Sequence, residues 1–397
     1  MTADARHVML VAGEASGDAL GAELMTALLG TGLPIRFSGV GGPAMTAAGL
    51  ASLFPMRELS VMGLLEVLPR ARGLLRRIAE TAAHVQAMRP DILVTIDSPG
   101  FTFRLARRLQ GAGLPLVHYV APQVWAWRPG RAKRIAPLFD HLLALLPFEP
   151  PLFSQHGLPS TFVGHPVTER LARPADGAAF RRELALAADA PLLLLLPGSR
   201  AAEVGRLLPV LLAATRHLQR QLVGLRTVVV AAQPVEALLR QRLAAEHPSP
   251  LLLPAARRLE AFAAAAGGPG AALAASGTAT LELALAGVPS IVTYRAQPVT
   301  ALIARRLIRL DYVGLPNILL GKTVLPELLQ QDCRADLLTA AAHDLLAKPA
   351  SAEAQRQATR RLWAMLRPPG PPPSVRAAEV VLEVMRAGRR PRQGSPR

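Results

Sequence analysis

Carboxylates follow two short apolar runs in the first half of the chain. Asp97 comes directly after the run Asp91–Ile96, and Glu14 stands in the turn Ala12–Asp18 that follows the run His7–Ala12. Ligands of open parallel sheets bind beyond the carboxyl ends of the strands, so both carboxylates are placed where a substrate would lie. An ionised carboxylate there can act as a general base toward a hydroxyl group. Asp97 is the first candidate for this role, and Glu14 is the second.

The same segments also have a structural interpretation. Asp97 precedes Ser98-Pro99, a pair that can open a helix, and Ser16 or Asp18 can cap the helix after their turn. The catalytic and capping interpretations of Asp97 both stay open. Capping accounts poorly for Glu14.

Small and basic residues follow two apolar runs in the second half. Pro197-Gly198-Ser199-Arg200 follows five consecutive leucines and opens a helical pattern. Backbone N–H groups at a helix start favour anions, and the guanidinium of Arg200 can bind phosphate oxygens. Capping through Glu203 is a weak explanation for this sequence, so we favour anion binding.

A second turn of this kind runs from Ser276 to Glu282. Its small residues would let a diphosphate approach bare N–H groups, and Glu282 stands one turn inside, at a depth suited to ribose hydroxyls. The alternative is an ordinary Ser/Thr cap with a glutamate in the first turn. The position of the turn in the second half favours a nucleotide-sugar site. The predicted ligands are Ser276, Gly277, Thr278, Thr280 and Glu282.

Scarce aromatic residues gather in the segment His118–Arg128. Trp125 and Trp127 are two of the three tryptophans of the chain, and Gln123 precedes them. Such side chains offer stacking faces and hydrogen-bond donors, which indicates a site. A surface loop anchored by its tryptophans is the alternative. We predict that Ser16, Gln123 and Trp125 line the part of the site that binds the acceptor, the molecule to which the sugar of the nucleotide sugar would be transferred.

Short apolar runs alternate with longer helical patterns along the chain, which predicts parallel strands buried on both faces. The fold class is therefore α/β, with two doubly wound Rossmann-like halves. The predicted strands are His7–Ala12, Ile35–Val40, Asp91–Ile96, Leu116–Val120, His141–Leu145, Thr161–Val163, Leu192–Leu196, Arg226–Ala231, Ala272–Ala275 and Ser290–Thr293.

A segment rich in proline, glycine and mixed charge separates the two halves. We predict an N-terminal Rossmann-like domain over 1–165 and a linker over 166–190. A C-terminal Rossmann-like domain follows over 191–366. The remainder, 367–397, is predicted to contain a proline-rich connector, a helix and a basic tail.

Composition limits the function classes. The 397 residues carry a formal net charge of +17, which favours polyanionic partners such as nucleic acid, anionic lipid or phosphorylated substrates. A generic basic surface is an equal alternative. No nucleic-acid module is recognisable, so we expect no specific nucleic-acid partner. The single cysteine, Cys333, and the absence of an export signal favour the cytoplasm. No metal-ligand spacing occurs, and we expect neither a metal nor a cofactor.

Taken in order and spacing, the motifs resemble those of the lipid-A-disaccharide synthase family. The resemblance runs from about His7 to about Cys333. It rests on Ala12–Asp18, Met62–Leu68, Ile96–Pro99, Tyr119–Trp127, Val163–Pro166, Leu196–Arg200, Ser276–Glu282 and Asp311–Asn317.

This resemblance implies a fold of two Rossmann-like domains facing across a cleft (GT-B) and an inverting, metal-independent glycosyltransferase of lipid A synthesis. Such enzymes join UDP-2,3-diacylglucosamine to 2,3-diacylglucosamine 1-phosphate and release UDP. It implies Asp97 as general base, Arg200 as diphosphate ligand, and Glu282 and Asn317 in the nucleotide site. In the family the third motif is usually Asp-x-Pro-Asp-Phe-Asn, whereas Gly100 and Thr102 replace the second Asp and the Asn here. The role of the replaced carboxylate is therefore open.

Both substrates are acylated, so the resemblance also implies a peripheral enzyme on the anionic surface of the inner membrane. The segment Met62–Leu75 combines apolar residues with Arg70, Arg72, Arg76 and Arg77, as suits such a surface, although a core helix would have a similar pattern. A UDP-N-acetylglucosamine 2-epimerase, or another GT-B enzyme with a soluble acceptor, is the alternative function. The sequence leaves the oligomeric state open and does not exclude a homodimer.

Overall fold

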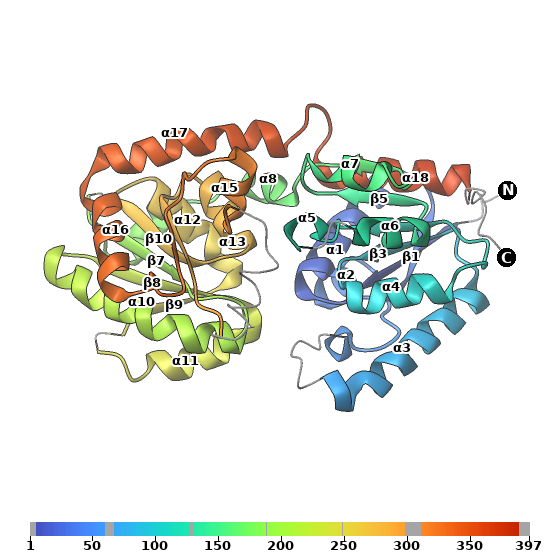
Figure 1. The fold of residues 1–397 in the computed structure, drawn as a ribbon, viewed down its shortest axis with the longest axis horizontal. Coiled ribbons are helices and arrows are strands. Elements are labelled where there is room, and N and C mark those ends of the chain that lie inside the picture. Colours follow the sequence, from blue (N-terminus) through green and yellow to red (C-terminus); the bar gives the residue numbers. More distant parts are fainter. Residues whose placement is uncertain are drawn as a thin grey trace. The chain divides into compact units, whose positions relative to one another are not determined.

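The computed structural model describes residues 5–59, 67–127, 130–187, 189–247, 249–297 and 311–388. The chain divides into two compact units, the first formed by Met1–Glu169 with Leu366–Arg397 and the second by Arg170–Met365. Each unit is a parallel sheet between layers of helices (Figure 1).

The first unit alternates strands and helices along its sequence. Its strands are β1 (Arg6–Ala12), β2 (Ile35–Val40), β3 (Ile92–Ile96), β4 (Leu116–Tyr119), β5 (His141–Ala144) and β6 (Ser160–Phe162). Its helices are α1 (Ala15–Leu29), α2 (Pro43–Ala47), α3 (Val67–Met88), α4 (Pro99–Arg108), α5 (Val124–Trp127), α6 (Arg131–Ile135), α7 (Glu149–Ser154), α8 (Pro166–Leu171), which begins in this unit, and α18 (Pro373–Ala387).

The first sheet has the order β2-β1-β3-β4-β5-β6, with all neighbours parallel. The chain moves outward from β1 to β2 and then returns to the other side of β1 with β3. The switch point of the topology therefore lies between β1 and β3, where ligands of such sheets bind. The turns carrying Glu14 and Asp97 are the ones that leave these two strands.

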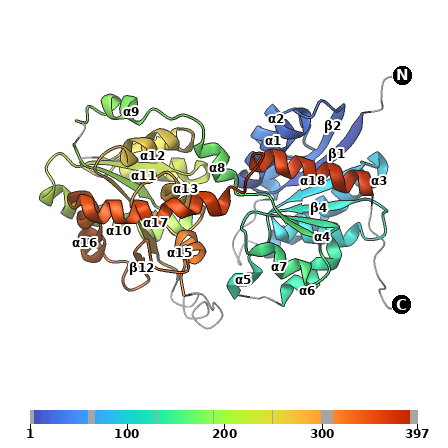
Figure 2. The same ribbon diagram turned by 90° about the horizontal axis from the view of Figure 1, so that it is seen from above.

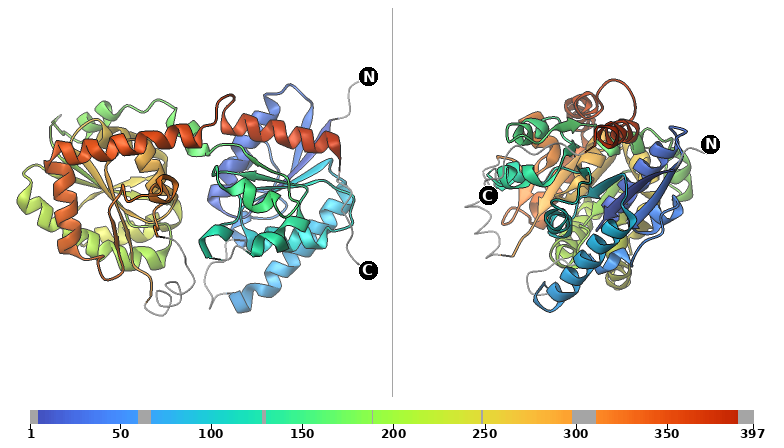
Figure 3. Two further views of the ribbon diagram at one scale, coloured as in Figure 1. Left: turned by 45° about the horizontal axis from the view of Figure 1, so that its top comes forward. Right: turned by 90° about the vertical axis from the view of Figure 1, so that its right-hand side faces the viewer.

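Side chains of β1 alternate between two cores. Met9 and Val11 pack in a core with α4 and α6, whereas Leu10 and Ala12 pack in another with α1, α2 and α18. A strand that is buried on both faces is apolar along its whole length, which is why these strands could be predicted from apolar runs in the sequence. Helix α18 lies beside α1 (Figure 2), and α3 lies beside α4 (Figures 1 and 3).

The second unit repeats this plan. Its strands are β7 (Leu192–Leu196), β8 (Arg226–Ala231), β9 (Leu251–Pro254), β10 (Gly270–Ala275), β11 (Ser290–Tyr294) and β12 (Glu327–Leu329). Its helices are α9 (Gly177–Glu183), α10 (Ala201–Gln221), α11 (Glu236–Leu243), α12 (Arg258–Ala266), α13 (Thr278–Leu285), α15 (Leu315–Leu320), α16 (Ala335–Ala347) and α17 (Pro349–Leu366).

The second sheet has the order β12-β11-β10-β7-β8-β9, again with parallel neighbours. Its switch point lies between β7 and β10. The turns that leave these strands are 197–200 and 276–277. Both sequence motifs of the second half therefore stand at one switch point.

The segment expected to be a linker contains folded structure. Helix α9 packs against α12, and Phe180 is fully buried in the core of the second unit. A connector would leave this aromatic ring in water, so 177–183 is part of the second unit. After α17 the chain returns to the first unit, where the backbone N–H of His165 donates to the carbonyl of Leu366.

The ten predicted strands match β1–β8, β10 and β11, and two strands were missed. β9 and β12 are the edges of the second sheet, and both are short. β12 is partly buried at the sheet edge and needs no apolar run, whereas the leucine run of β9 is only three residues long and lies between Pro250 and Pro254.

Candidate functional site

Asp97 lies at the carboxyl end of β3 in an unusual backbone conformation. Asp97 and Ser98 have φ of 50° and 48°, and Val120 at the end of neighbouring β4 has φ of 82°. A β-branched residue with positive φ is a clear outlier, and such conformations persist only where surrounding structure holds them. The backbone N–H of Asp97 donates to the carbonyl of Tyr119 over 2.9 Å, and the hydroxyl of Thr102 donates to the carbonyl of Asp97 over 2.8 Å.

Burial affects the protonation of Asp97. It raises the pKa of the carboxyl group, and a hydrogen bond from the backbone N–H of Ser98 opposes this rise. A carboxylate with a raised pKa is a better proton acceptor once it is ionised. The capping interpretation is weakened, because Ser98 and not Asp97 is the N-cap of α4.

Glu14 is the N-cap residue of α1, next to Gly13. A Cβ on Gly13 would collide with the side chain of Ser98, so the turns after β1 and β3 touch each other. Glu14 and Asp97 thus belong to adjoining turns at the switch point. Glu14 is half-buried, and Ser16 is exposed.

Asp18 has a role that the sequence interpretation assigned to the wrong helix. Its buried carboxylate accepts hydrogen bonds from the backbone N–H groups of Gly42, Ala44 and Met45 over 2.8–3.0 Å. It therefore caps α2, whereas no side chain caps α1. This long-range bond has no signature in the spacing of the motif.

The aromatic segment is attached to α7. Trp125 Nε1 donates to Glu149 Oε1 over 3.2 Å, and its ring meets Phe148 edge-on with centroids 5.3 Å apart. Gln123 is exposed. The structure therefore places Gln123 at the surface and Trp125 against the body of the first unit.

Glu149 is a buried carboxylate that the sequence interpretation missed. Its side chain accepts from the backbone N–H of Leu146 over 3.0 Å as well as from Trp125. Burial raises its pKa to about 7, although these hydrogen bonds oppose the rise. No motif contains Glu149, and only the folded chain brings it to Trp125.

Arg200 precedes α10 at the end of the turn after β7. Its Nη1 lies 3.1 Å from Glu203 Oε1, and Glu203 Oε2 accepts from the backbone N–H of Ser199 over 3.2 Å. The Arg200 side chain is 55% exposed, so its guanidinium keeps donors that face solvent. Glu203 therefore binds both Ser199 and Arg200 at the start of α10. From the sequence, capping through Glu203 had been considered a weak explanation of this motif.

The turn after β10 has an open helix start. No side chain caps α13, whose N-cap residue is Gly277, and a Cβ on Gly277 would meet no atom within 4 Å. The first N–H groups of a helix lack partners within it. Thr278 is exposed, whereas the buried Thr280 donates its hydroxyl to the carbonyl of Gly277 over 2.7 Å. Ser276 donates to the carbonyl of Val313 over 3.2 Å.

Glu282 is fixed by Arg258 of α12. Arg258 Nε lies 2.9 Å from Glu282 Oε2, and Arg258 Nη2 donates to Oε1 over 3.3 Å. The Glu282 side chain is only 13% exposed. The two residues are 24 positions apart, so sequence spacing gave no sign of Arg258.

Asn317 is fully buried in α15. Its amide donates to the carbonyl of Leu325 and to Glu327 Oε1, both over 2.8 Å, and its oxygen accepts from the backbone of Val324 and Leu325. These contacts favour a positioning role for Asn317, which holds the segment before β12.

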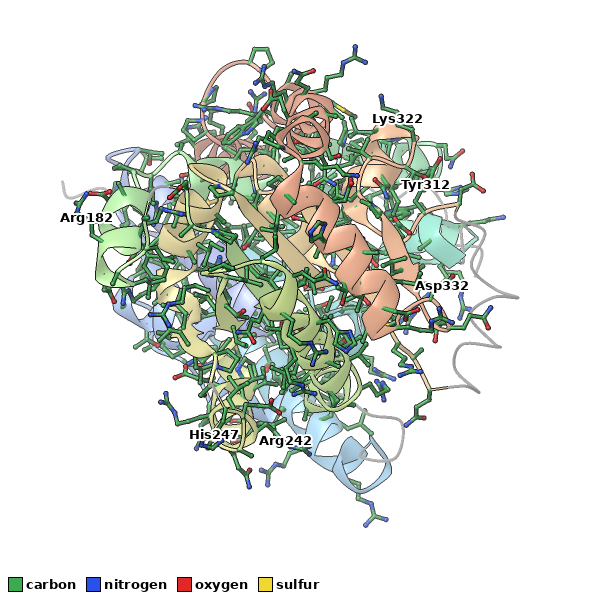
Figure 4. The ribbon with its side chains drawn as sticks, turned by 90° about the vertical axis from the view of Figure 1, so that its left-hand side faces the viewer. Arg182, Arg242, His247, Tyr312, Lys322 and Asp332 are labelled. Carbon is green, nitrogen blue, oxygen red and sulfur yellow. The ribbon has the colours of Figure 1, made fainter. Side chains whose placement is uncertain are left out.

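The neighbours of Asn317 in the sequence reach the surface. Figure 4 shows Tyr312 and Lys322 on the side of the second unit that faces the viewer. Lys322 is exposed and Tyr312 is half-buried.

Part of the expected membrane segment, 60–66, lies outside the described residues, as do the side chains of 67–71. Leu75 of α3 is 58% exposed, whereas Leu74 packs against the core. Arg77 is paired with Glu58 and Glu80 over 2.8 and 2.6 Å. Within the described residues, no helix is both long and apolar enough to span a membrane.

Among the same described segments, no group of three or more His, Cys, Asp or Glu is arranged to hold a metal ion. Arg200 and the open start of α13 could bind a diphosphate at the second switch point, since N–H groups and guanidinium forks bind phosphate oxygens. Glu282 could accept hydrogen bonds from hydroxyl groups beside it.

Solved structures share this architecture. UDP-GlcNAc 2-epimerase from Neisseria meningitidis, bound to UDP-GlcNAc, superposes with a TM-score of 0.62 at 12% identity, covering 96% of this chain and 100% of that one. A glycotransferase of kitacinnamycin gives a TM-score of 0.63 at 17% identity, covering 96% and 100%. At these identities the likeness establishes the fold, which is the predicted pair of Rossmann-like sheets of GT-B proteins.

Sequence relatives are closer. The family model described as lipid-A-disaccharide synthetase matches residues 8–369. A lipid-A-disaccharide synthase of Rhodospirillum centenum is 48% identical over 382 residues, covering 95% of this chain and 94% of that protein. The protein of the same name from Paramagnetospirillum magneticum is 45% identical over 394 residues, covering 98% and 100%. The chain therefore belongs to the lipid-A-disaccharide synthase family.

Proposed function

We propose that this enzyme joins UDP-2,3-diacylglucosamine to 2,3-diacylglucosamine 1-phosphate, forming the lipid A disaccharide 1-phosphate and UDP. Family membership over residues 8–369 is the observation that carries the proposal. The two switch points support it, because one presents carboxylates and the other an open helix start beside an arginine.

Asp97 acts as the general base in this proposal. The 6-hydroxyl of the acceptor attacks the anomeric carbon of the donor from the face opposite UDP, and Asp97 takes the hydroxyl proton. The bond between that carbon and the diphosphate oxygen breaks, and the configuration inverts. The raised pKa of Asp97 suits proton acceptance. Glu14, in the adjoining turn, is the second candidate.

The second unit binds the UDP part of the donor. Helix N–H groups at Gly277 and Thr278, together with Arg200, stabilise the negative charge that develops on the leaving diphosphate. Glu282 accepts hydrogen bonds from ribose hydroxyls while Arg258 holds it in place. Ser276, Thr280 and Asn317 shape the turn, through the contacts described above.

The enzyme works on the cytoplasmic face of the inner membrane in this proposal. Acylated substrates stay in the bilayer, so the protein must approach an anionic surface. The exposed Leu75, with Arg72 and Arg76 on the same helix, supports contact through α3 and the preceding segment. The first unit, Met1–Glu169 with Leu366–Arg397, is the acceptor domain in this proposal, and Arg170–Met365, which includes α9, is the donor domain.

Mass spectrometry of products tests the reaction. Purified enzyme incubated with both substrates should release UDP and form one disaccharide monophosphate. The epimerase alternative is tested by proton NMR, because a 2-epimer has the same mass as its substrate. With UDP-N-acetylglucosamine alone, that alternative expects the 2-epimer, and our proposal expects unchanged substrate. Formation of the epimer without disaccharide would overturn the proposal.

A further inference from the structure

Two adjoining hollows on the first unit are lined by residues of both α4 and α6. Figures 1 and 2 show where these two helices lie. Their volumes are about 310 and 300 Å³, at the small end of ligand pockets, which span roughly 300–1,000 Å³. Phe103, Arg107 and Arg131 line both. The hollows therefore form one surface, which we call the arginine pocket.

Four arginines surround this pocket. Arg104 and Arg107 stand three residues apart on α4, and Arg131 and Arg134 stand three apart on α6. Residues at that spacing share one helix face. All four are exposed, so they can meet a ligand from solvent.

The four arginines of the pocket have no acidic partner in the part of the chain that the structure describes. No carboxylate there forms an ion pair with any of them, whereas Arg77, Arg257 and Arg258 each pair with glutamate. Arg104 donates to the carbonyl of Gly100, one turn earlier. Like charges gathered without a counter-ion repel each other, and an anion in the pocket removes that repulsion.

The floor of the pocket is apolar and rigid. Phe103 is 5% exposed and packs edge-on against His118 and Phe139 with centroids 5.1 and 5.7 Å apart. Burial lowers the pKa of His118 to about 3, so this ring is neutral and contributes no charge. The guanidinium groups around this apolar floor have planar sets of donors, and such donors can bind two phosphate oxygens at once.

The pocket adjoins the predicted base. Pro99 and Gly100 line its near end and follow Asp97 by two and three residues. Arg104 is five residues beyond Pro99, the first residue of α4, or about 7.5 Å along the helix. The acceptor of the proposed reaction carries its phosphate on C1 and its nucleophilic hydroxyl on C6, which is attached to C5, the other carbon bonded to the ring oxygen.

We propose that the arginine pocket binds a phosphate monoester, and that this group is the 1-phosphate of the acceptor, held while the 6-hydroxyl of the same sugar reaches Asp97. This inference rests on the proposed function for the identity of the ligand. The pocket binds the phosphate and positions the acceptor, and it does not take part in proton transfer.

Calorimetry with glucosamine 1-phosphate and with inorganic phosphate tests the site on the whole protein. The double variant Arg107→Gln/Arg131→Gln removes two lining charges. We expect its affinity for both probes to fall by about tenfold or more, as loss of charge-assisted hydrogen bonds requires. The matched control Arg108→Gln/Lys133→Gln removes the same charge from exposed, non-lining positions of the same helices and should bind as the unaltered protein does.

A second variant tests the pocket without removing an arginine. A Cβ on Gly100 would lie 3.9 Å from Arg104 Nη1, so Gly100→Asp places a carboxylate beside that guanidinium. We expect weaker binding of glucosamine 1-phosphate, whereas Gly100→Asn should have a smaller effect. In turnover assays, both Gly100→Asp and the arginine double variant should raise the KM for the acceptor and leave the KM for the UDP-sugar unchanged.

Three results would overturn the inference. The first is no saturable phosphate binding by the unaltered protein, and the second is an equal loss of affinity in the lining and control double variants. The third is that the lining double variant no longer sediments with phosphatidic acid vesicles but still binds glucosamine 1-phosphate. The last would assign the pocket to a lipid headgroup. The calorimetry does not depend on turnover, so it tests the phosphate site separately from the reaction. If the protein binds phosphate through the lining arginines but forms no disaccharide, the proposed function is refuted and the phosphate site is not.

Discussion

Replacing Glu149 by glutamine should change how the stability of the first unit depends on pH. Glu149 is 3% exposed, and burial raises its pKa from the ordinary 4.5 to about 7. Between these values the folded protein holds a proton that the unfolded chain releases. The stability from this group is therefore fully present below pH 4.5 and is lost as pH rises through 7.

The magnitude follows from the two pKa values. A shift from 4.5 to about 7 corresponds to about 3 kcal/mol in total. By linkage, about 1 kcal/mol of this is lost by pH 5 and nearly all of it by pH 8, leaving a change of about 2–3 kcal/mol across that range. For a unit of this size, that is roughly 5–10 °C in Tm.

Thermal unfolding of the protein and of Glu149→Gln from pH 5 to pH 8 measures this change. The difference in Tm, unaltered protein minus variant, should fall by that amount as pH rises, because glutamine does not titrate. Glu379→Gln, which alters an exposed glutamate of α18 in the same unit, is the control and should leave the profile unchanged. A pH-independent difference for Glu149→Gln would refute the assigned pKa.

Three further predictions concern single side chains. Asp97→Asn should fold and bind UDP but lose about 10²–10⁴ in turnover, and the pH–rate profile should lose an acidic limb that lies above the ordinary aspartate range because burial raises this pKa. Arg258→Ala releases Glu282, so calorimetry should show about tenfold weaker UDP binding, which Arg258→Lys should partly restore. Asp18→Ala removes three hydrogen bonds to the start of α2 and should cost about 1–3 kcal/mol in urea unfolding, whereas Ser16→Ala should cost little.

The sequence was sufficient for ten of the twelve described strands and for the turns at the switch points, for a physical reason. A strand buried on both faces, such as Leu192–Leu196, must be apolar throughout, and the polar residues directly after it must lie at the sheet edge. Chain order then determines which turns adjoin. Glu14 and Asp97 were placed together on this basis, and the contact of Gly13 with Ser98 agrees with it.

The partners of the site residues could not be inferred in this way. Arg258 meets Glu282 across two helices, and Trp125 meets Glu149 because α5 and α7 fold toward each other. Such pairs depend on helix orientation, which leaves no period in the sequence. The same holds for Asp18, whose carboxylate caps a helix that begins 25 residues later along the chain.

The two departures from the family motif now have different physical meanings. Thr102 replaces an asparagine, and its hydroxyl donates to the carbonyls of Asp97 and Ser98 over 2.8 and 3.0 Å. It therefore holds the strained turn that carries Asp97, the proposed base. Gly100 replaces a carboxylate at a point where a side chain would face Arg104. That change leaves the turn of Asp97 intact and makes the arginine pocket one charge more positive. If the pocket holds the acceptor phosphate as we propose, a carboxylate restored at position 100 should change the KM for the acceptor much more than kcat.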